Sequence, residues 1–366
     1  MAAGRIVPPR DIKVKTMYVN EFIKDTERVF PQEGRRAYLR YDMNENPEGL
    51  PASFVEMVKK EITPEFLSVY PEPSAFTKKY ASYVGVKADQ ILATNGSDMA
   101  IRYLLETFGE RGKEVVTVAP SFEMYWVNCK ILGYRHVPVA YENDLTMKVE
   151  NILHAISENT RIVVLLNPNN PVGNTYTREE AESVIQKAKA VGALVIIDEA
   201  YHYFYEGTFL DFLQKYDNVA ILRTFSKLFS IAACRLGVII GSKEIIRYTK
   251  NAKLTFDVNS IALLFGERLL DHPEVEAELI RQEKEGKAYA MEELKKQGYF
   301  VRDCKGNYIF VEPRKDTHDL AKALEDRHKI LVKTYGNGLL RKFLRISVGS
   351  KEAMQRFLEA FLPLDA

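Results

Sequence analysis

Hydrophobic and polar positions alternate in blocks through the middle of the chain. Short apolar runs rich in β-branched residues predict strands, and several are followed by a stretch with helical spacing. We expect these strands at 91–94, 115–118, 136–140, 161–166, 193–197, 219–222 and 236–240. The stretch from Thr177 to Glu180 reads as a capping box that opens one of the helices. Strands alternating with helices favour an α/β fold with a doubly wound, mostly parallel sheet.

The pattern changes after about residue 253. Two long helices, followed by two short strands, are typical of an α+β unit. We expect the helices near 260–270 and 274–297, and the strands at 308–311 and 343–348. The irregular first 45 residues are expected to pack onto this unit. The chain of 366 residues is long enough for two domains. We therefore expect a large ligand-binding domain at 47–255 and a small domain formed by 1–46 and 256–366.

Composition and charge exclude several functions. The chain has 51 Lys and Arg against 50 Asp and Glu, so its net charge of +1 favours neither nucleic acid nor an anionic membrane. No apolar run could cross a bilayer, and the first residues lack the apolar core of a secretory signal. Cys129, Cys234 and Cys304 form no CxxC pair, and HExxH and Gly-rich nucleotide motifs are missing. We expect a cytoplasmic protein without a metal site.

One lysine stands directly after a predicted buried strand. Lys227 ends the tetrapeptide that begins at Thr224, and Arg235 follows eight residues later. An ammonium group is costly to bury unless it is paired or deprotonated. The hydroxyls of Thr224 and Ser226 and the guanidinium of Arg235 would bind a phosphate, while burial and the neighbouring cation would lower the lysine pKa. These surroundings suit a lysine that forms a Schiff base; a solvated loop lysine is the alternative.

Other polar residues stand where further strands end. Ligands of open α/β sheets bind at the carboxyl ends of the strands. Ser97 and Asp98 open a helix whose free N–H groups suit a phosphate, although a plain helix cap is the alternative. Asp198 ends a buried strand, where a carboxylate needs a cationic partner such as a pyridinium N–H; a structural ion pair or a helix cap is the alternative.

Four more residues fit the parts of a phosphorylated pyridine aldehyde and its substrate. Asn170 and Tyr201 could bind a phenolate oxygen, and Tyr125 offers a ring for stacking or for core packing. Arg345 lies in an apolar strand, where a guanidinium needs a bidentate anion such as a substrate α-carboxylate or an internal carboxylate.

Six motifs occur in order along the chain. They are Asp42–Pro47, the Tyr-Pro-x-Pro segment at Tyr70–Pro73, Asn-Pro-Asn-Asn-Pro-Val-Gly at Asn167–Gly173, Asp-Glu-Ala-Tyr at Asp198–Tyr201, Thr-Phe-Ser-Lys at Thr224–Lys227, and Leu-Arg-Ile-Ser-Val-Gly at Leu344–Gly349. With this set, the chain resembles the fold-type I pyridoxal-phosphate (PLP) aminotransferases, specifically the histidinol-phosphate aminotransferase group.

This resemblance implies a role for each residue. Lys227 would bind the cofactor aldehyde and move the substrate proton, Asp198 would face the pyridine nitrogen, and Arg345 would bind the substrate α-carboxylate. Asn170 and Tyr201 would bind the phenolate oxygen. The phosphate would be held by Ser97, Asp98, Thr224, Ser226 and Arg235.

The resemblance also bears on subunits and substrate. Tyr70 would reach the phosphate of a neighbouring subunit, which implies a homodimer with shared active sites, and Asn46 would line the substrate side. The chain departs from the group in Val172, where Thr is usual, and in its N-terminal arm, which lacks the Leu-x-Pro-Tyr segment that helps bind histidinol phosphate. Histidinol phosphate is therefore not the expected substrate.

The function expected from these observations is a PLP-dependent aminotransferase. It would move an amino group between an amino acid or amino-alcohol phosphate and a 2-oxo acid. A PLP-dependent decarboxylase of an O-phosphorylated amino acid shares the scaffold and stays open as the alternative. A non-catalytic ligand-binding module, as in some transcription regulators, is disfavoured because the short N-terminal arm leaves no room for a DNA-binding domain.

Overall fold

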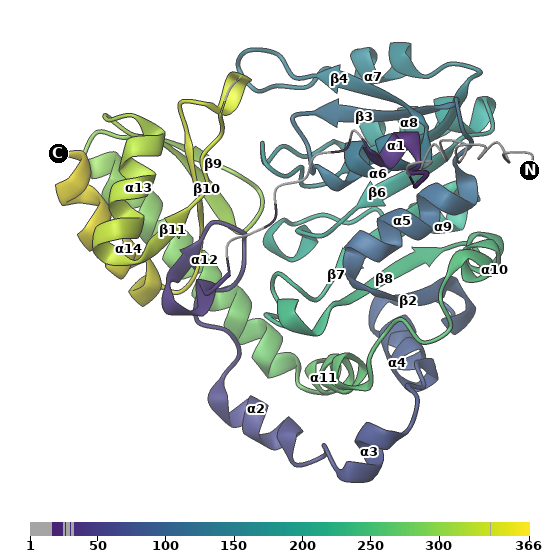
Figure 1. The fold of residues 1–366 in the computed structure, drawn as a ribbon, viewed down its shortest axis with the longest axis horizontal. Helices are drawn as coiled ribbons and strands as arrows, with labels where there is room; N and C mark the ends of the chain where they lie inside the picture. Colours follow the sequence, from purple (N-terminus) through teal and green to yellow (C-terminus); the bar gives the residue numbers. More distant parts are fainter. Residues whose placement is uncertain (1–16, 25, 27–29, 31–32, 337) are drawn as a thin grey trace, which may run out of the picture.

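The computed structural model describes residues 17–24, 26, 30, 33–336 and 338–366 (Figure 1). Its largest sheet has seven strands in the order β2-β8-β7-β6-β5-β3-β4. The strands are β2 (Ile91–Asn95), β3 (Glu114–Ala119), β4 (Arg135–Ala140), β5 (Thr160–Leu166), β6 (Leu194–Asp198), β7 (Val219–Thr224) and β8 (Leu236–Gly241). All neighbours are parallel except β8, which is antiparallel to both β2 and β7. The predicted doubly wound α/β sheet is confirmed.

The large sheet is covered on both faces, which explains why its central strands β5, β6 and β7 are mostly apolar. Val195 and Ile197 of β6 pack in a cluster with α8 (Arg178–Ala190). Their neighbours Leu194 and Ile196 point the other way, into a cluster with α5 (Gly96–Phe108) and α6 (Met124–Leu132). The capping box predicted at Thr177 and Glu180 is present, with the Thr177 side chain 3.2 Å from the Glu180 nitrogen.

A second, smaller unit has its own core. β10 (Tyr308–Glu312) lies between β9 (Phe300–Asp303) and β12 (Leu344–Ser347), antiparallel to both. Its apolar face packs against α12 (Pro273–Lys296) and α14 (Lys351–Asp365). β12 is shorter than the strand predicted at 343–348. The long α12 follows α11 (Ser260–Asp271), close to the bounds that the sequence predicts.

The N-terminal residues contact both units. β1 (Leu39–Tyr41) pairs in parallel with β11 (Ile330–Val332) of the smaller unit. By contrast, α1 (Glu21–Lys24) lies beside α6 of the large unit in Figure 1. The first sixteen residues of the expected small domain lie outside the described residues, and the boundaries at 46/47 and 255/256 stay a prediction.

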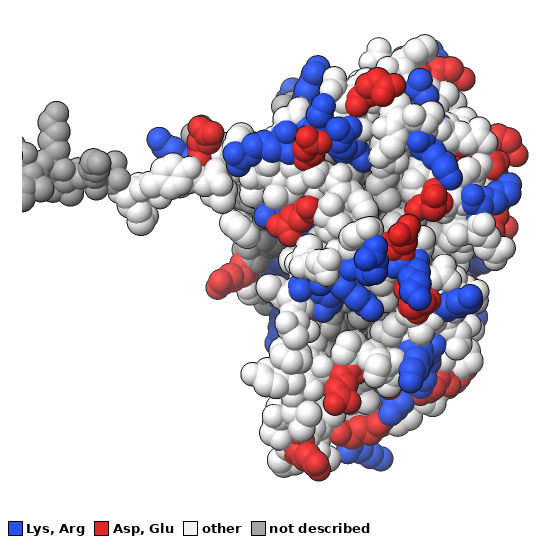
Figure 2. All heavy atoms as spheres, turned by 90° about the vertical axis from the view of Figure 1, so that its right-hand side faces the viewer, with Lys and Arg blue, Asp and Glu red and all other residues white. Residues whose placement is uncertain are grey.

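The surface carries mixed charge. On the face shown in Figure 2, basic and acidic side chains are interspersed, in line with the net charge of +1. Within the described part of the chain, no helix combines the length and apolar character needed to span a membrane.

Candidate active site

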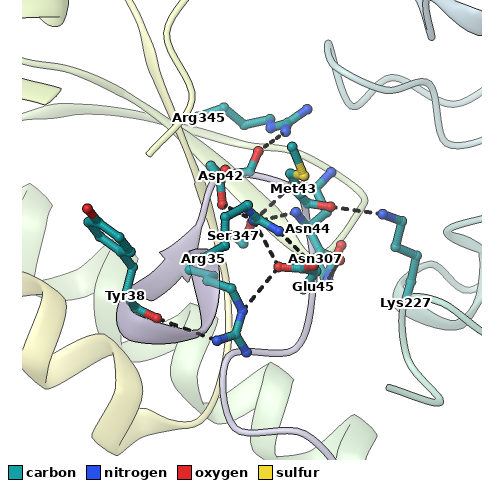
Figure 3. A network of polar contacts seen from close by, with 11 residues as sticks. Arg35, Tyr38, Asp42, Met43, Asn44, Glu45, Lys227, Asn307, Arg345 and Ser347 are labelled. Atoms are coloured by element: carbon teal, nitrogen blue, oxygen red, sulfur yellow. Dashed lines mark hydrogen bonds and ion pairs between the residues drawn. The ribbon is translucent and has the colours of Figure 1, made fainter. Parts of the chain in front are cut away.

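Lys227 lies just beyond the end of β7 in an enclosed position. Its Nζ donates a hydrogen bond to the carbonyl of Met43, 2.9 Å away (Figure 3). Burial, and secondarily the positive charge of Arg345, lower the pKa of this lysine to about 8. A lysine with this pKa holds a substantial fraction of neutral, nucleophilic amine near neutral pH.

Asp198 ends the neighbouring strand β6 and is 4% exposed. Its Oδ2 accepts a hydrogen bond from the Tyr125 hydroxyl at 2.8 Å, and its Oδ1 accepts one from the Ala200 nitrogen at 3.1 Å. Burial raises the pKa of the carboxyl group to about 6. Among the described residues, no cation forms an ion pair with Asp198. The site therefore holds a buried carboxylate that suits a cationic ligand.

Tyr125 makes a contact that the sequence did not predict. We expected its ring to offer a stacking face or to pack in the core. The ring is 1% exposed within the cluster formed by α5 and α6, and the hydroxyl group reaches Asp198. This contact places Tyr125 in the site through its hydroxyl.

The residues predicted to bind a phosphate surround the N-terminus of α5. Gly96 has φ +71°, and a Cβ there would lie 2.5 Å from Arg235 Nη2. A Cβ on Gly237 would lie 2.6 Å from the Ser97 nitrogen, so the two glycines allow β8 and the start of α5 to approach closely. Arg235 binds Asp98 at 2.8 Å. The Thr224 hydroxyl donates to Ser226 Oγ at 3.0 Å on the adjoining strand end.

A four-residue segment at 42–45, which we call the strap, ties the site together (Figure 3). Its successive groups contact different site residues. The Asp42 carbonyl accepts from Arg345, the Met43 carbonyl accepts from Lys227, and Asn44 Nδ2 donates to the Tyr201 hydroxyl at 2.9 Å.

Arg35 holds the strap from its other side. Its guanidinium binds the Asp42 carboxylate at 2.6 Å and both oxygens of Glu45 at 3.0 Å. The sequence predicted a polar turn at Asp42–Pro47, but it gave no sign that two of its carbonyls would bind Lys227 and Arg345. These contacts could not be predicted, because every residue has a backbone carbonyl and the residue type does not show which carbonyl faces the site.

Arg345 and Asn170 are brought together by the structure. Arg345 is 7% exposed, and its Nη1 donates to Asn170 Oδ1 at 2.7 Å. Its Nε has no partner among the described residues. Tyr201 packs edge-to-face on Tyr308, and burial raises its pKa to about 12. Asn170 and Tyr201, expected to share one ligand atom, have Arg345 and Asn44 respectively as their present partners.

Two further residues were expected at the site, Asn46 on its substrate side and Tyr70 at its phosphate. Asn46 Nδ2 donates to Ser230 Oγ at 2.9 Å, close to the loop that carries Lys227. Tyr70 is 72% exposed and stacks on Phe256, with ring centroids 4.3 Å apart. None of the contacts found for Tyr70 involves the residues around Lys227, so this chain alone does not place it in the site.

Comparison with known proteins gives one consistent result. Residues 40–361 match the family model "Aminotransferase class I and II". The chain is 31% identical to a histidinol-phosphate aminotransferase of Clostridium novyi (strain NT), over 90% of this chain and 92% of that one. It is 33% identical to a histidinol-phosphate aminotransferase of Thermoanaerobacter sp. (strain X514), over 86% and 89%.

Solved structures agree with the sequence relatives. Histidinol-phosphate aminotransferase from Sinorhizobium meliloti, in complex with pyridoxal-5'-phosphate, superposes with a TM-score of 0.85 and 21% identity, covering 96% of this chain and 98% of that one. The enzyme from Clostridium acetobutylicum gives 0.80 at 25% identity, covering 89% and 99%. The chain therefore belongs to the aminotransferase class I and II family and is a PLP-dependent aminotransferase of fold type I.

Proposed function

We propose that the enzyme holds PLP at the carboxyl ends of β6 and β7, with Lys227 as the residue that binds its aldehyde. The observation that carries this proposal is the placement of a half-buried lysine and a buried carboxylate at the carboxyl ends of two neighbouring parallel strands. One is a lysine with a lowered pKa, and the other is Asp198, a carboxylate without a cation. When bound, the cofactor supplies a carbon that accepts the amino group and a ring that takes up electrons.

The other groups fit the cofactor in chemical kind. Arg235, two hydroxyls and the N-terminus of α5 are donors for a phosphate. In the proposal, Asp198 keeps the ring nitrogen protonated, while Asn170 and Tyr201 donate to the phenolate oxygen. The phosphate would be held by Ser97, Thr224, Ser226 and Arg235, and Asp98 positions Arg235 through their ion pair. Tyr125 holds Asp198 through its hydroxyl.

The substrate side is formed by Arg345 and Asn46. Arg345 binds the α-carboxylate of an amino acid and then of the 2-oxo acid, exchanging the Asp42 carbonyl and Asn170 for carboxylate oxygens. Lys227 moves the proton between the α-carbon and the cofactor. An amino-alcohol phosphate is the second candidate donor, supported by the names of the relatives. The three cysteines are free, which supports a cytoplasmic location.

A donor screen tests this function. The PLP-loaded enzyme is mixed with single amino donors, and loss of the cofactor's visible band is followed before a 2-oxo acid is added. Amine transfer that depends on the 2-oxo acid supports an aminotransferase, whereas release of carbon dioxide without transfer supports the decarboxylase alternative.

Loading of the cofactor should depend on pH through Lys227. Only the neutral amine attacks an aldehyde, and the pKa of Lys227 is about 8. The rate at which cofactor-free protein binds PLP covalently should rise about tenfold per pH unit below pH 8 and level off above it. Stopped-flow absorbance measures this rate. In Arg345→Gln the midpoint should move to higher pH, because a cation that lowers the lysine pKa is gone; an unmoved midpoint would contradict that attribution.

We also propose a homodimer in which Tyr70 reaches the phosphate site of the partner. The support is a group of exposed apolar side chains near Tyr70 in the chain and around its stacking partner, which soluble monomers rarely show. They are Leu67 (62% exposed), Val69 (55%), Leu254 (67%) and Phe256 (53%).

Leu254→Glu should therefore convert the dimer to monomers and weaken PLP retention. A charge placed in an apolar interface is left desolvated and unpaired. Light scattering after size-exclusion chromatography measures the mass, and dialysis measures retention. Phe300→Glu, at an apolar position on β9 that is 57% exposed, is the matched control and should change neither. A wild-type protein that is monomeric at micromolar concentration would refute the proposal.

A further inference from the structure

A small cavity lies between the two units, beside the proposed active site. Lys227 and Asn46 line it from one side, and Glu283 of α12 and Asn307 before β10 line it from the other. It offers about 20 Å³ to a water-sized occupant. A water needs roughly 10–15 Å³ by the same measure, so the cavity has room for at least one small polar group.

Two buried oxygen atoms at this cavity lack hydrogen-bond partners in the described part of the chain. They are Glu283 Oε1 and Asn307 Oδ1, in side chains that are 9% and 2% exposed. The Asn307 amide is fixed, because its Nδ2 donates to the Asn44 carbonyl at 3.1 Å. The atom of Asn307 that lacks a partner among the described residues is therefore the amide oxygen Oδ1, a hydrogen-bond acceptor. Two unpartnered acceptors are costly to bury, and a donor-rich occupant would remove that cost.

The charges around Glu283 leave its carboxylate without an ion pair among the described residues. The nearby Lys287 is engaged elsewhere, since its Nζ binds the Asp303 carboxylate at 3.1 Å and donates to the carbonyls of Cys304 and Gly306. Burial raises the pKa of Glu283 to about 7. A cation in the cavity would favour the ionised carboxylate of Glu283, and it requires Lys227, which lines the same cavity, in its neutral form.

We propose that this cavity is a subsite for the distal ammonium group of the amino donor, bound by Glu283 and Asn307. The donor is then a basic amino acid with a terminal primary amine, held by its α-carboxylate on Arg345 and by its far end in the cavity. The space is large enough for one ammonium group. This inference rests on the proposed function, because it needs Lys227 and Arg345 in their proposed roles.

Matched donors test the subsite. L-lysine and L-ornithine are compared with their neutral counterparts L-norleucine and L-norvaline on the PLP-loaded enzyme. One cationic donor should exceed its neutral counterpart in kcat/KM by roughly 10- to 100-fold, the range of a charge-assisted hydrogen bond. In Glu283→Gln that ratio should fall toward one. Glu285→Gln, which changes an exposed carboxylate on the same helix, should leave the ratio unchanged.

Other results would overturn the assignment. An equal preference for cationic and neutral donors, retained in Glu283→Gln, shows that the cavity holds only water. The cavity would instead be a site for a free cation if potassium or ammonium chloride raises the melting temperature above that in lithium chloride. This rise would be lost in Glu283→Gln, and the enzyme would show no preference for cationic donors. If no donor bleaches the cofactor band, the proposed function fails. Calorimetric binding of L-lysine to the wild type and to Glu283→Gln then still tests the subsite. Weaker binding to Glu283→Gln supports the subsite, and equal or absent binding refutes it.

Discussion

Replacement of Lys227 by alanine is expected to lower kcat for amino transfer by at least roughly 10³-fold, since the residue serves as both nucleophile and proton carrier. Lys227 follows the end of β7, and its Nζ donates a hydrogen bond to the Met43 carbonyl of the strap. PLP should stay partly bound in the variant, because the proposed phosphate ligands around α5 are unchanged. Steady-state transfer with the best donor measures the loss, and retained absorbance measures the cofactor.

A chemical rescue separates this role from a structural one. Methylamine added to Lys227→Ala should restore part of the activity with a dependence on the concentration of its neutral form. Lys243→Ala, at a side chain that is 77% exposed, is the control and should keep full activity. Full activity in Lys227→Ala, or a folded variant that binds the cofactor and does not respond to methylamine, would contradict the proposed role of Lys227.

The fold could be predicted largely from the sequence because its strongest signals are local. Strands such as β5 and β7 are buried on both faces and contain unbroken apolar runs, at 162–166 and 219–222. The capping box at Thr177 fixed the start of α8. The path of the N-terminal residues was harder to predict. β1 and β11 are separated by almost the whole chain, and the three residues of β1 do not indicate with which strand it pairs.

The site could be predicted where side chains carry the chemistry and parallel strands bring them to one edge. Lys227 and Asp198 were predicted in this way, whereas Arg345 was predicted as a guanidinium inside an apolar strand and lies on β12, an antiparallel strand of the smaller unit. Glu283 was not among the predicted site residues. It belongs to a helix rich in Glu and Lys, where a further carboxylate is expected to be exposed to solvent. Its burial depends on how α12 packs between the two units, which periodicity does not reveal. The same holds for Tyr125, whose hydroxyl reaches Asp198 only through the packing of α6.

Replacement of Asp198 by asparagine should lower activity by roughly 10²- to 10³-fold, the usual effect of removing one preorganised electrostatic group. An amide cannot carry the negative charge that keeps a pyridine nitrogen protonated. The same change should stabilise the cofactor-free protein. The ordinary pKa of the carboxyl is 3.8, and folding raises it to about 6, so the native state binds more protons between these values. The free energy of unfolding therefore falls as pH rises from about 4 to 6 and stays lower above.

At pH 8 this difference of about two pKa units lowers the free energy of unfolding of the wild type by roughly 3 kcal/mol. The asparagine variant has no carboxyl group to ionise, so its free energy of unfolding is not lowered in this way. Near pH 4 the two proteins should unfold alike, because the native carboxyl is then neutral and the Tyr125 hydroxyl has an acceptor in both. Urea unfolding of the cofactor-free proteins at the two pH values measures this, with Asp326→Asn, at an exposed position on α13 (Thr317–His328), as the control. Equal stability at pH 8 would show that Asp198 is not strained in the empty site. Activity within threefold of wild type would mean that another group faces the ring nitrogen. The opposite signs expected for stability and turnover distinguish a carboxylate kept for the cofactor from one that holds the fold together.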